Sequence, residues 1–288
     1  MSAVSPIGAH VSVSRGLVRG ALAEAERIRA EVVQVFLANP RGWAEPTADH
    51  EGDELFRAAC AERELPVFVH APYLINFGSP STETLAKSRR ALEFSLRRGA
   101  AVGARGVVVH AGSAVLGNRW EQAVDQVRAE VLPLLREDWP RLLIEPTAGG
   151  GGALAADVDS TVAYLDALDD ERVGLCLDTC HVHASGHDMS TELRTTFASL
   201  AHRIGRGRIG LVHVNDSRDP CGSKRDRHAT IGAGSIGLDA MSELFRAPAL
   251  RGIPMIVETD DATHAADIAT LKALRSSAAD KGRVAGAH

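Results

Sequence analysis

The chain has 288 residues, of which 45% are hydrophobic and 24% are charged, the composition of a globular protein with a large buried core. No apolar run approaches the ~20 residues that span a bilayer, and residues 1–10 lack the basic and apolar segments of a signal peptide. These features predict a cytoplasmic protein with no membrane partner. The net charge of −5 argues by itself against a nucleic-acid partner.

Short apolar runs alternate with longer amphipathic segments along the chain. The apolar runs predict strands over Ile7–Val11, Val32–Ala38, Val67–His70, Gly106–His110, Arg141–Glu145, Val173–Asp178, Ile209–Val214 and Pro254–Glu258. The other segments predict helices over Leu17–Ala30, Asp53–Glu64, Thr82–Val102 (N-capped by Ser81 or Thr82), Arg119–Arg136, Asp157–Leu168, Thr191–Ile204, Leu238–Phe245 and His264–Arg275. This alternation predicts a single (β/α)8 TIM barrel over residues 1–275, with a flexible tail over residues 276–288.

Side chains that can bind metals recur where the predicted strands end. Six strands carry such a residue at or near the carboxyl end: His70, His110, Glu145, Asp178, His213 and Glu258. In a barrel these ends converge on one mouth, where buried carboxylates repel one another unless a cation neutralises them. Each residue has an ordinary explanation as well, since Asp178 could cap the next helix and Glu258 could pair with an arginine. The agreement among six strands favours a metal centre.

The segment Leu211–His228, LVHVNDSRDPCGSKRDRH, adds donors and cations. Asp226 and His228 lie on one side of an extended segment, and His181 follows the sixth strand. Five imidazoles and four carboxylates then make nine donors, which suits three zinc ions with about three protein ligands each. Manganese or iron could also occupy such sites, and three divalent ions would bring the net charge to about +1.

The other histidines and the cysteines follow no such pattern. We expect the histidines at the surface or supporting the ligands: His50, His183, His187, His202, His264 and His288. The cysteines Cys60, Cys176, Cys180 and Cys221 form no CxxC pair, so a disulfide framework is not expected. Cys176 and Cys180, which flank Asp178, are interpreted as small buried side chains.

Several short motifs contain the candidate ligands: HAPYLIN (His70–Asn76), VVVHAGS (Val107–Ser113), EPTAGGG (Glu145–Gly151), CLDTCH (Cys176–His181), HVNDSRDPCGSKRDRH (His213–His228) and IVET (Ile256–Thr259). These motifs resemble those of the endonuclease IV family of zinc-dependent apurinic/apyrimidinic (AP) endonucleases. The resemblance extends from Ile7 to the last predicted helix. It implies one zinc held by His70, His110 and Glu145; a second held by the bridging Glu145 with Asp178, His213 and Glu258; and a third held by His181, Asp226 and His228.

The resemblance also implies an activity: hydrolysis of the phosphodiester 5′ to an abasic site in double-stranded DNA, and removal of 3′-blocking groups, by a monomer in base-excision repair. Zinc lowers the pKa of bound water, and Glu145, with Asp178 or Glu258, would orient that water. The DNA-binding residues would be Arg41, Tyr73, Leu74, Lys224, Arg225 and Arg227.

These DNA-binding residues have two expected roles. Arg41, Tyr73 and Leu74 would wedge into the duplex at the lesion, although Tyr73 and Leu74 could equally anchor a loop on the barrel rim. The cations of the 224–227 segment would contact backbone phosphates without reading sequence, or else form a solvated basic face.

The sequence departs from the family pattern at Pro146, where many relatives are expected to carry asparagine. Proline removes a side-chain amide and a backbone N–H, which affects substrate positioning more than metal binding. The alternative function is a sugar isomerase or epimerase of the same barrel superfamily, with Glu145, Asp178, His213 and Glu258 around one metal. A non-catalytic DNA-binding protein is a third reading, and the complete ligand set argues against it.

Overall fold

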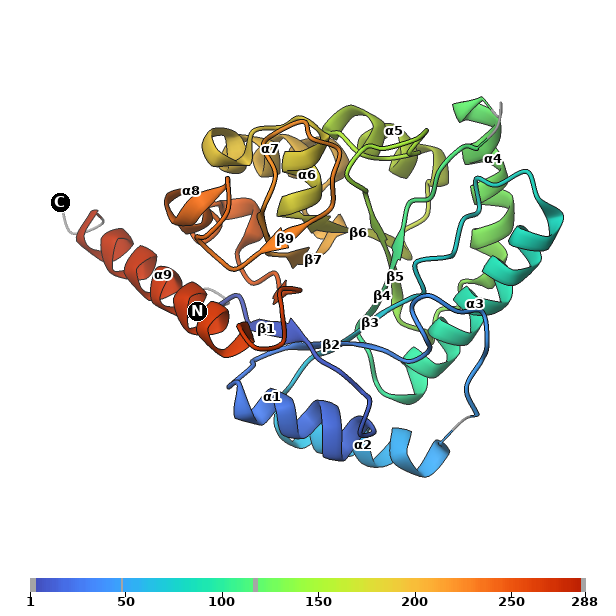
Figure 1. Cartoon of the computed structure of the whole chain (residues 1–288), viewed down its shortest axis with the longest axis horizontal. Helices are drawn as coiled ribbons and strands as arrows, with labels where there is room; N and C mark the ends of the chain where they lie inside the picture. The colour runs from blue at the N-terminus through green and yellow to red at the C-terminus, as the bar shows by residue number, and fades with distance from the viewer. Residues whose placement is uncertain (1–3, 48, 116–118, 286–288) are drawn as a thin grey trace.

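The computed structural model describes residues 4–47, 49–115 and 119–285. It contains a closed barrel of parallel strands surrounded by helices (Figure 1), which confirms the predicted TIM barrel. The barrel strands are β1 (Ile7–His10), β2 (Val33–Phe36), β3 (Val67–His70), β4 (Gly106–His110), β5 (Arg141–Glu145), β6 (Val173–Asp178), β7 (Ile209–His213) and β10 (Met255–Val257). They follow chain order around the barrel, and β10 closes it by pairing with β1, Ile7 opposite Met255.

Helices connect successive strands and cover the outside of the barrel (Figure 1). They are α1 (Ala23–Arg27), α2 (His50–Glu62), α3 (Thr82–Ala101), α4 (Trp120–Val131), α5 (Val158–Leu168), α6 (Thr179–Ser185), α7 (Met189–Ile204), α8 (Gly237–Glu243) and α9 (His264–Ala285). Side chains of Asp49, Ser81 and Asp157 accept hydrogen bonds from the first turns of α2, α3 and α5, which satisfies otherwise unpaired N–H groups. Ser81 is therefore the N-cap of α3, one of the two caps predicted.

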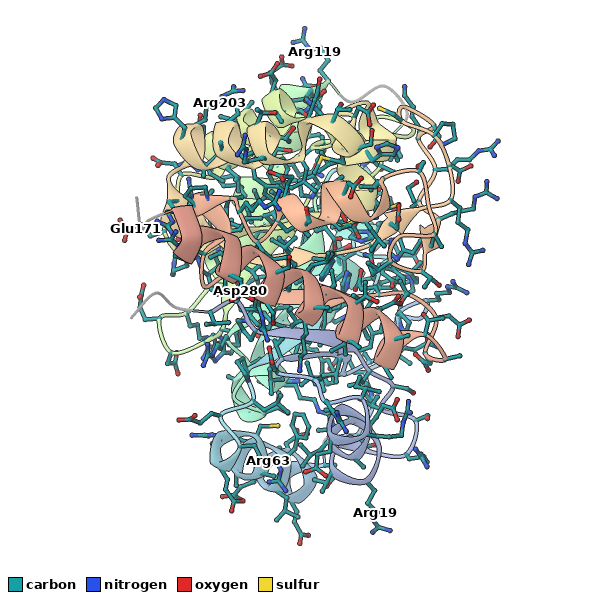
Figure 2. The ribbon with its side chains drawn as sticks, turned by 90° about the vertical axis from the view of Figure 1, so that its left-hand side faces the viewer. Arg19, Arg63, Arg119, Glu171, Arg203 and Asp280 are labelled. Atoms are coloured by element: carbon teal, nitrogen blue, oxygen red, sulfur yellow. The ribbon has the colours of Figure 1, made fainter. Side chains whose placement is uncertain are left out.

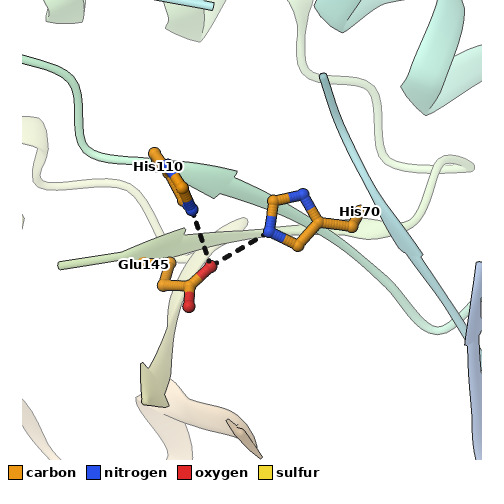
Figure 3. A group of neighbouring side chains, drawn as sticks. All are labelled: His70, His110 and Glu145. Atoms are coloured by element: carbon orange, nitrogen blue, oxygen red, sulfur yellow. Dashed lines mark hydrogen bonds and ion pairs between the residues drawn. The ribbon is translucent and has the colours of Figure 1, made fainter. Parts of the chain in front are cut away.

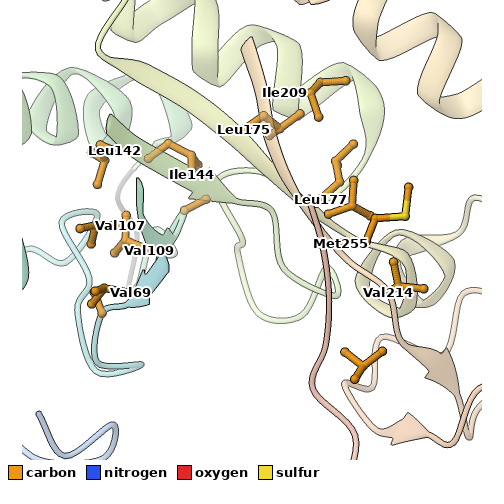
Figure 4. Close-up of a cluster of buried hydrophobic side chains, with 14 of the residues drawn as sticks. Val69, Val107, Val109, Leu142, Ile144, Leu175, Leu177, Ile209, Val214 and Met255 are labelled. Atoms are coloured by element: carbon orange, nitrogen blue, oxygen red, sulfur yellow. The ribbon is translucent and has the colours of Figure 1, made fainter. Parts of the chain in front are cut away.

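Alternate side chains of the barrel strands belong to two different cores. Outward-facing residues pack in the large core cluster drawn in Figure 4, including Val69, Val107, Val109, Leu142, Ile144, Leu175, Leu177 and Ile209. A separate interior layer consists of Val32, Phe68, Val108, Leu143, Cys176, Leu211 and Ile256. Strands buried on both faces read as continuous apolar runs, which explains the sequence pattern. The next inward-facing residue lies two positions further along each strand.

The outer surface is charged. Figure 2 shows the side chains of Arg63, Arg119 and Arg203 projecting from it. Arg63 Nε lies 2.7 Å from Glu26 Oε1, and such exposed pairs contribute about 0–1 kcal/mol each. Among the helices of the described residues, none has the length and apolar character needed to cross a membrane.

Several predicted helix boundaries were wrong. The first predicted helix begins as a π-helix, η1 (Leu17–Leu22), and α4 gives way to a 3-10 turn, η2 (Leu132–Leu134), whose proline lacks an N–H. The short helix α6 was missed, and α7 begins two residues before Thr191, on the Asp188 cap. The last helix continues past Arg275 to Ala285, since nothing in that segment breaks a helix before Gly282. The flexibility expected of residues 276–288 stays a prediction.

Candidate metal centre

A layer of polar side chains closes the carboxyl end of the barrel. Each member lies two residues after a member of the apolar interior layer: Gln34, His70, His110, Glu145, Asp178, His213 and Glu258. Alternate residues of a strand share a face, so seven strands deliver a polar side chain to one mouth, and β1 supplies His10. Gln34 was missed by sequence reasoning, and His10 was not assigned a role. The sequence signal for Gln34 is a single amide side chain within the otherwise apolar run Val32–Ala38.

The first donor group contains His70, His110 and Glu145 (Figure 3). Glu145 Oε2 lies 3.1 Å from His70 Nε2 and 3.4 Å from His110 Nε2. His70 Nδ1 donates to the carbonyl of Ala71 at 2.7 Å, which leaves the lone pair on Nε2. This is the tautomer that a metal at Nε2 requires.

The second donor group contains Glu145, Asp178, His213 and Glu258, whose ligand atoms lie within 4.8 Å of one another. Glu145 Oε1 lies 2.9 Å from His213 Nδ1, and Glu258 Oε2 lies 3.2 Å from the same nitrogen. The two oxygens of Glu145 therefore face two different donor groups. A carboxylate that bridges two ions needs this arrangement.

The third donor group lies beside Asp178. Asp226 Oδ2 lies 3.2 Å from His181 Nε2, and Asp226 Oδ1 lies 2.9 Å from His228 Nε2. Asp178 Oδ2 lies 3.4 Å from His228 Nε2, while Asp178 Oδ1 accepts from the N–H groups of Cys180 and His181 at the start of α6. Asp178 therefore caps a helix with one oxygen, as its ordinary explanation predicted, and faces the donor groups with the other.

Backbone carbonyls orient the imidazoles of this third group. His181 Nδ1 donates to the carbonyl of Pro146 at 3.0 Å, and His228 Nδ1 donates to the carbonyl of Glu258 at 3.1 Å. Proline lacks a backbone N–H but keeps its carbonyl, so Pro146 still accepts this hydrogen bond from His181. His228 Nε2 is buried and has no hydrogen bond of normal geometry, although carboxylates surround it. Such an orphaned lone pair fits a metal ligand.

Two buried amides hold the carboxylates and His213 in place. Gln34 Oε1 accepts from His213 Nε2 at 3.0 Å, and Gln34 Nε2 donates to Glu258 Oε1 at 2.7 Å. Asn215 Nδ2 donates to Asp178 Oδ2 at 2.7 Å, and its Oδ1 accepts from the Glu258 N–H at 2.8 Å. Both amides have 0% exposure. They therefore fix which atoms of the second group face the cavity.

Neighbouring charges in the centre offset the free-energy cost of burying ionised side chains. Burial alone would raise the pKa of the Glu145 carboxyl, but the charge and hydrogen bonds of the neighbouring imidazoles lower it well below its ordinary value. Burial alone would lower the pKa of His228, but the negative charges of Asp178, Asp226 and Glu258 raise it to about 9. The buried carboxylates stay ionised only because positive charge lies beside them. A divalent metal ion can supply that positive charge. The mixture of imidazole and carboxylate donors suits borderline metals.

The predicted wedge residues border this centre. A cavity of about 560 Å³ is lined by residues of the centre and of the adjoining loops, including Tyr73, Leu74, His110, His181, Lys224 and Asp226. Tyr73 and Leu74 are 42% and 37% exposed. The Tyr73 ring stacks on the His110 ring with centroids 5.3 Å apart, and the backbone N–H of Tyr73 donates to the carbonyl of Pro40. Tyr73 is therefore both anchored on the rim of the barrel and accessible to solvent. Its loop adjoins the loop that carries Arg41.

The predicted phosphate-binding cations differ in whether a carboxylate already pairs with them. Lys224 lines the cavity above the centre. Arg227 Nε donates to Asp219 Oδ2 at 2.7 Å, and Arg225 Nη1 lies 3.7 Å from Asp219 Oδ1. Asp219 therefore offsets part of the positive charge of this loop, which sequence spacing did not indicate.

Comparisons with known proteins agree with this geometry. The family model described as a xylose isomerase-like TIM barrel matches residues 22–277. The probable endonuclease 4 of Streptomyces coelicolor is 48% identical over 280 residues, which cover 94% of this chain and 95% of that protein. The probable endonuclease 4 of Mycobacterium tuberculosis is 38% identical, covering 92% and 97%.

Solved structures give the same result. Endonuclease IV from Thermus thermophilus superposes with a TM-score of 0.82 at 31% identity, covering 92% of this chain and 98% of that one. An L-ribulose 3-epimerase gives a TM-score of 0.72 at 16% identity, covering 98% of each chain. The likeness to the epimerase is one of fold alone.

Proposed function

Because this chain belongs to the endonuclease IV family, we propose that it is a metal-dependent DNA repair endonuclease that hydrolyses the phosphodiester 5′ to AP sites in duplex DNA. The products are a 3′-hydroxyl and a 5′-deoxyribose phosphate, and the same chemistry removes 3′-blocking groups. The observation that carries the proposal is the set of donor groups at the barrel mouth, which meet at Glu145 and Asp178.

The donor groups suit three zinc ions, one per group. His70, His110 and Glu145 would hold the first; Glu145, Asp178, His213 and Glu258 the second; and His181, Asp226 and His228 the third. The imidazole tautomers support this assignment, because the hydrogen bonds of His70, His181, His213 and His228 leave the other nitrogen facing a carboxylate. When bound, such ions would supply Lewis-acid activation of water and of the scissile phosphate.

The protein contributes orientation and charge to the reaction. Glu145 lies between two donor groups, where it would orient the attacking water. Asp178 and Glu258 flank it, and the amides of Asn215 and Gln34 fix their carboxylates. A rigid, nearly solvent-free set of acceptors needs little reorganisation during reaction. We assign Glu145, Asp178 and Glu258 as the catalytic residues on this basis.

The DNA-binding surface would surround the cavity. Tyr73 and Leu74 expose apolar and planar groups beside the metal centre, where they can replace a base in the stack while the abasic nucleotide turns out. Arg41 lies on the adjoining loop. Lys224 would contact the backbone phosphates, with Arg225 and Arg227 contributing less because Asp219 pairs with them. The partner is double-stranded DNA, bound by a monomer in the cytoplasm.

A sugar isomerase or epimerase is not favoured. An enzyme of that type needs one metal, held by Glu145, Asp178, His213 and Glu258. It does not need the contacts of Glu145 with His70 and His110, or a further group with Asp226 and His228. The epimerase that resembles this chain shares 16% identity, which supports a common fold only.

A nicking assay tests the proposal. A duplex carrying one tetrahydrofuran abasic analogue is incubated with metal-replete protein and with chelator-treated protein, and the undamaged duplex of the same sequence serves as control. We expect metal-dependent cleavage immediately 5′ to the analogue, leaving a 3′-hydroxyl that a polymerase can extend. Equal cleavage of both duplexes by the metal-replete protein would refute the proposed function.

A further inference from the structure

Another group of metal-binding side chains lies outside the barrel mouth. His183 in α6, Asp188 at the N-cap of α7 and Cys221 in the loop after β7 each offer one ligand atom, and these atoms lie within 4.8 Å of one another. None of the three belongs to the nine donors described above. His183 is 2% exposed, so it does not lie at the surface, which was one of the two placements expected for it. Cys221 is accessible to solvent.

Hydrogen bonds fix the imidazole of His183 in a ligand tautomer. Ser235 Oγ donates to the carbonyl of Asp219 at 2.6 Å, so it accepts from His183 Nε2 at 3.1 Å. The proton is therefore on Nε2, and Nδ1 carries the lone pair 3.6 Å from Asp188 Oδ1. Nδ1 accepts one long bond of 3.2 Å from the Met189 N–H. A metal ion would replace that bond, and an N–H in the first turn of a helix is readily hydrated.

Asp188 and Cys221 are held near this nitrogen by separate contacts. Asp188 Oδ1 accepts from the N–H and hydroxyl of Ser190 at 3.0 and 2.6 Å, which fixes the carboxylate at the start of α7. The Gly222 N–H donates to the carbonyl of His183 at 3.0 Å, and the Lys224 N–H donates to the carbonyl of Ala184 at 2.9 Å. The loop that carries Cys221 is thus fastened to α6 by its backbone.

We propose that His183, Asp188 and Cys221 form an additional site for a thiophilic divalent metal ion of the zinc class. One imidazole, one carboxylate and one thiolate are typical zinc ligands, and water completes a tetrahedron. Cys221 loses its thiol proton to solvent as the sulfur binds the metal. The bound ion would link the loop of residues 220–228 to helix α6. This loop also carries Lys224. This inference does not depend on the proposed nuclease activity.

Cobalt substitution tests the site in the full-length chain. The nine donors at the barrel mouth are nitrogen and oxygen atoms, so a sulfur-to-cobalt charge-transfer band reports a thiolate ligand specifically. We expect this band when metal-free protein is titrated with Co²⁺. We expect Cys221→Ser to lose the band and about one bound ion per chain, and to retain the remaining ions. Hydrogen exchange of residues 221–224 should slow more on metal addition in the native chain than in Cys221→Ser, which keeps Asp226 and His228 as ligands of the third donor group.

A matched variant shows which cysteine is responsible. Cys180→Ser removes the thiol that lies with Asp226 and His228 at the main centre, and it should keep the charge-transfer band. Asp188→Asn keeps the hydrogen-bonding side chain at the cap of α7 but should weaken cobalt binding at this site. Absence of the band from the native chain would overturn the proposal, as would its persistence in Cys221→Ser or its loss from Cys180→Ser.

Discussion

Substitution of Gln34 by methionine tests whether the buried amide orients the metal ligands. Methionine nearly preserves the volume of the side chain but removes the acceptor for His213 Nε2 and the donor to Glu258 Oε1, which lie 3.0 and 2.7 Å away. Both partners are buried, and an unsatisfied buried polar group costs about 1–3 kcal/mol. Part of this cost falls on metal binding, because His213 then loses the bond that fixes its tautomer. Supporting residues of this kind contribute about 10–100-fold to metal affinity, or about 1.4–2.7 kcal/mol.

The zinc dissociation constant is measured by competition with a chromophoric chelator, and the bound ions per chain are counted. Gln126→Met is the matched control, because Gln126 Nε2 donates to the carbonyls of Phe77 and Ser79 at 2.6 and 2.8 Å, away from every ligand. The control should lower the free energy of unfolding and leave zinc affinity unchanged. If Gln34→Met binds zinc as tightly as the native chain, or if both variants weaken binding equally, the orienting role is wrong.

Three further predictions address catalysis, DNA binding and pH. Glu145→Ala should reduce nicking of the tetrahydrofuran duplex by more than about 100-fold and lower the metal content, because it removes the carboxylate that faces two donor groups; near-normal turnover would contradict its bridging role. Lys224→Ala should reduce the slope of log Kd against log salt concentration by about 1 for abasic and intact duplexes alike, measured by fluorescence anisotropy, and an unchanged slope would exclude a phosphate contact. Burial alone would raise the pKa of Glu31, but Arg275 and Lys272 donate hydrogen bonds that lower it to about 2. The folded-state pKa is depressed, so this stabilisation is present above pH 4.5 and is lost as the pH falls towards 2. Because the Glu31 side chain is 35% exposed, screening limits the contribution to about 1–2 kcal/mol. Denaturant unfolding should therefore show Glu31→Gln less stable than the native chain by that amount at pH 7, with a difference that shrinks below pH 4; a constant difference would contradict the ion-pair explanation.

The barrel and the placing of most candidate donors at its mouth could be predicted because they depend on local sequence periodicity. A strand buried on both faces has an unbroken apolar run, and a histidine or carboxylate at its end stands out against that run. His70, His110 and Glu145 therefore identify both the strand ends and the centre. Topology then brings these ends together, so no contact between distant residues had to be predicted.

Other features depend on contacts that a strand pattern does not contain. Gln34 lies inside an apolar run, and its importance becomes visible only when His213 and Glu258 are placed beside it. Asp219 offsets Arg227 because a short two-stranded ladder folds the loop back on itself: β8 (Asp216–Ser217) pairs with β9 (His228–Ala229). The surroundings of His183 were not predicted for the same reason, since Cys221 and Ser235 come from distant segments of the chain.

The loop between β7 and β9 would connect the proposed metal binding with the proposed DNA binding. At its inner end, the buried carboxylate of Asp216 accepts from the N–H groups of Gly232 and Gly234 at 3.0 Å each, and from that of Ile236 at 2.9 Å. At its outer end, backbone bonds fasten it to α6. Between these anchors it presents Lys224 to the cavity and Asp226 to the third donor group.

A change of charge in this loop and a change of its shape should therefore have different effects. Lys224→Ala removes a charge and leaves both anchors intact, so it should weaken DNA binding without altering the bound metal. Asp216→Asn weakens the inner anchor, since an amide cannot accept all the N–H groups that the carboxylate does. It should lower both zinc content and DNA affinity, measured by metal analysis and fluorescence anisotropy. Native DNA affinity and full zinc content in Asp216→Asn would show that the anchor is dispensable and that the loop acts on DNA through charge alone.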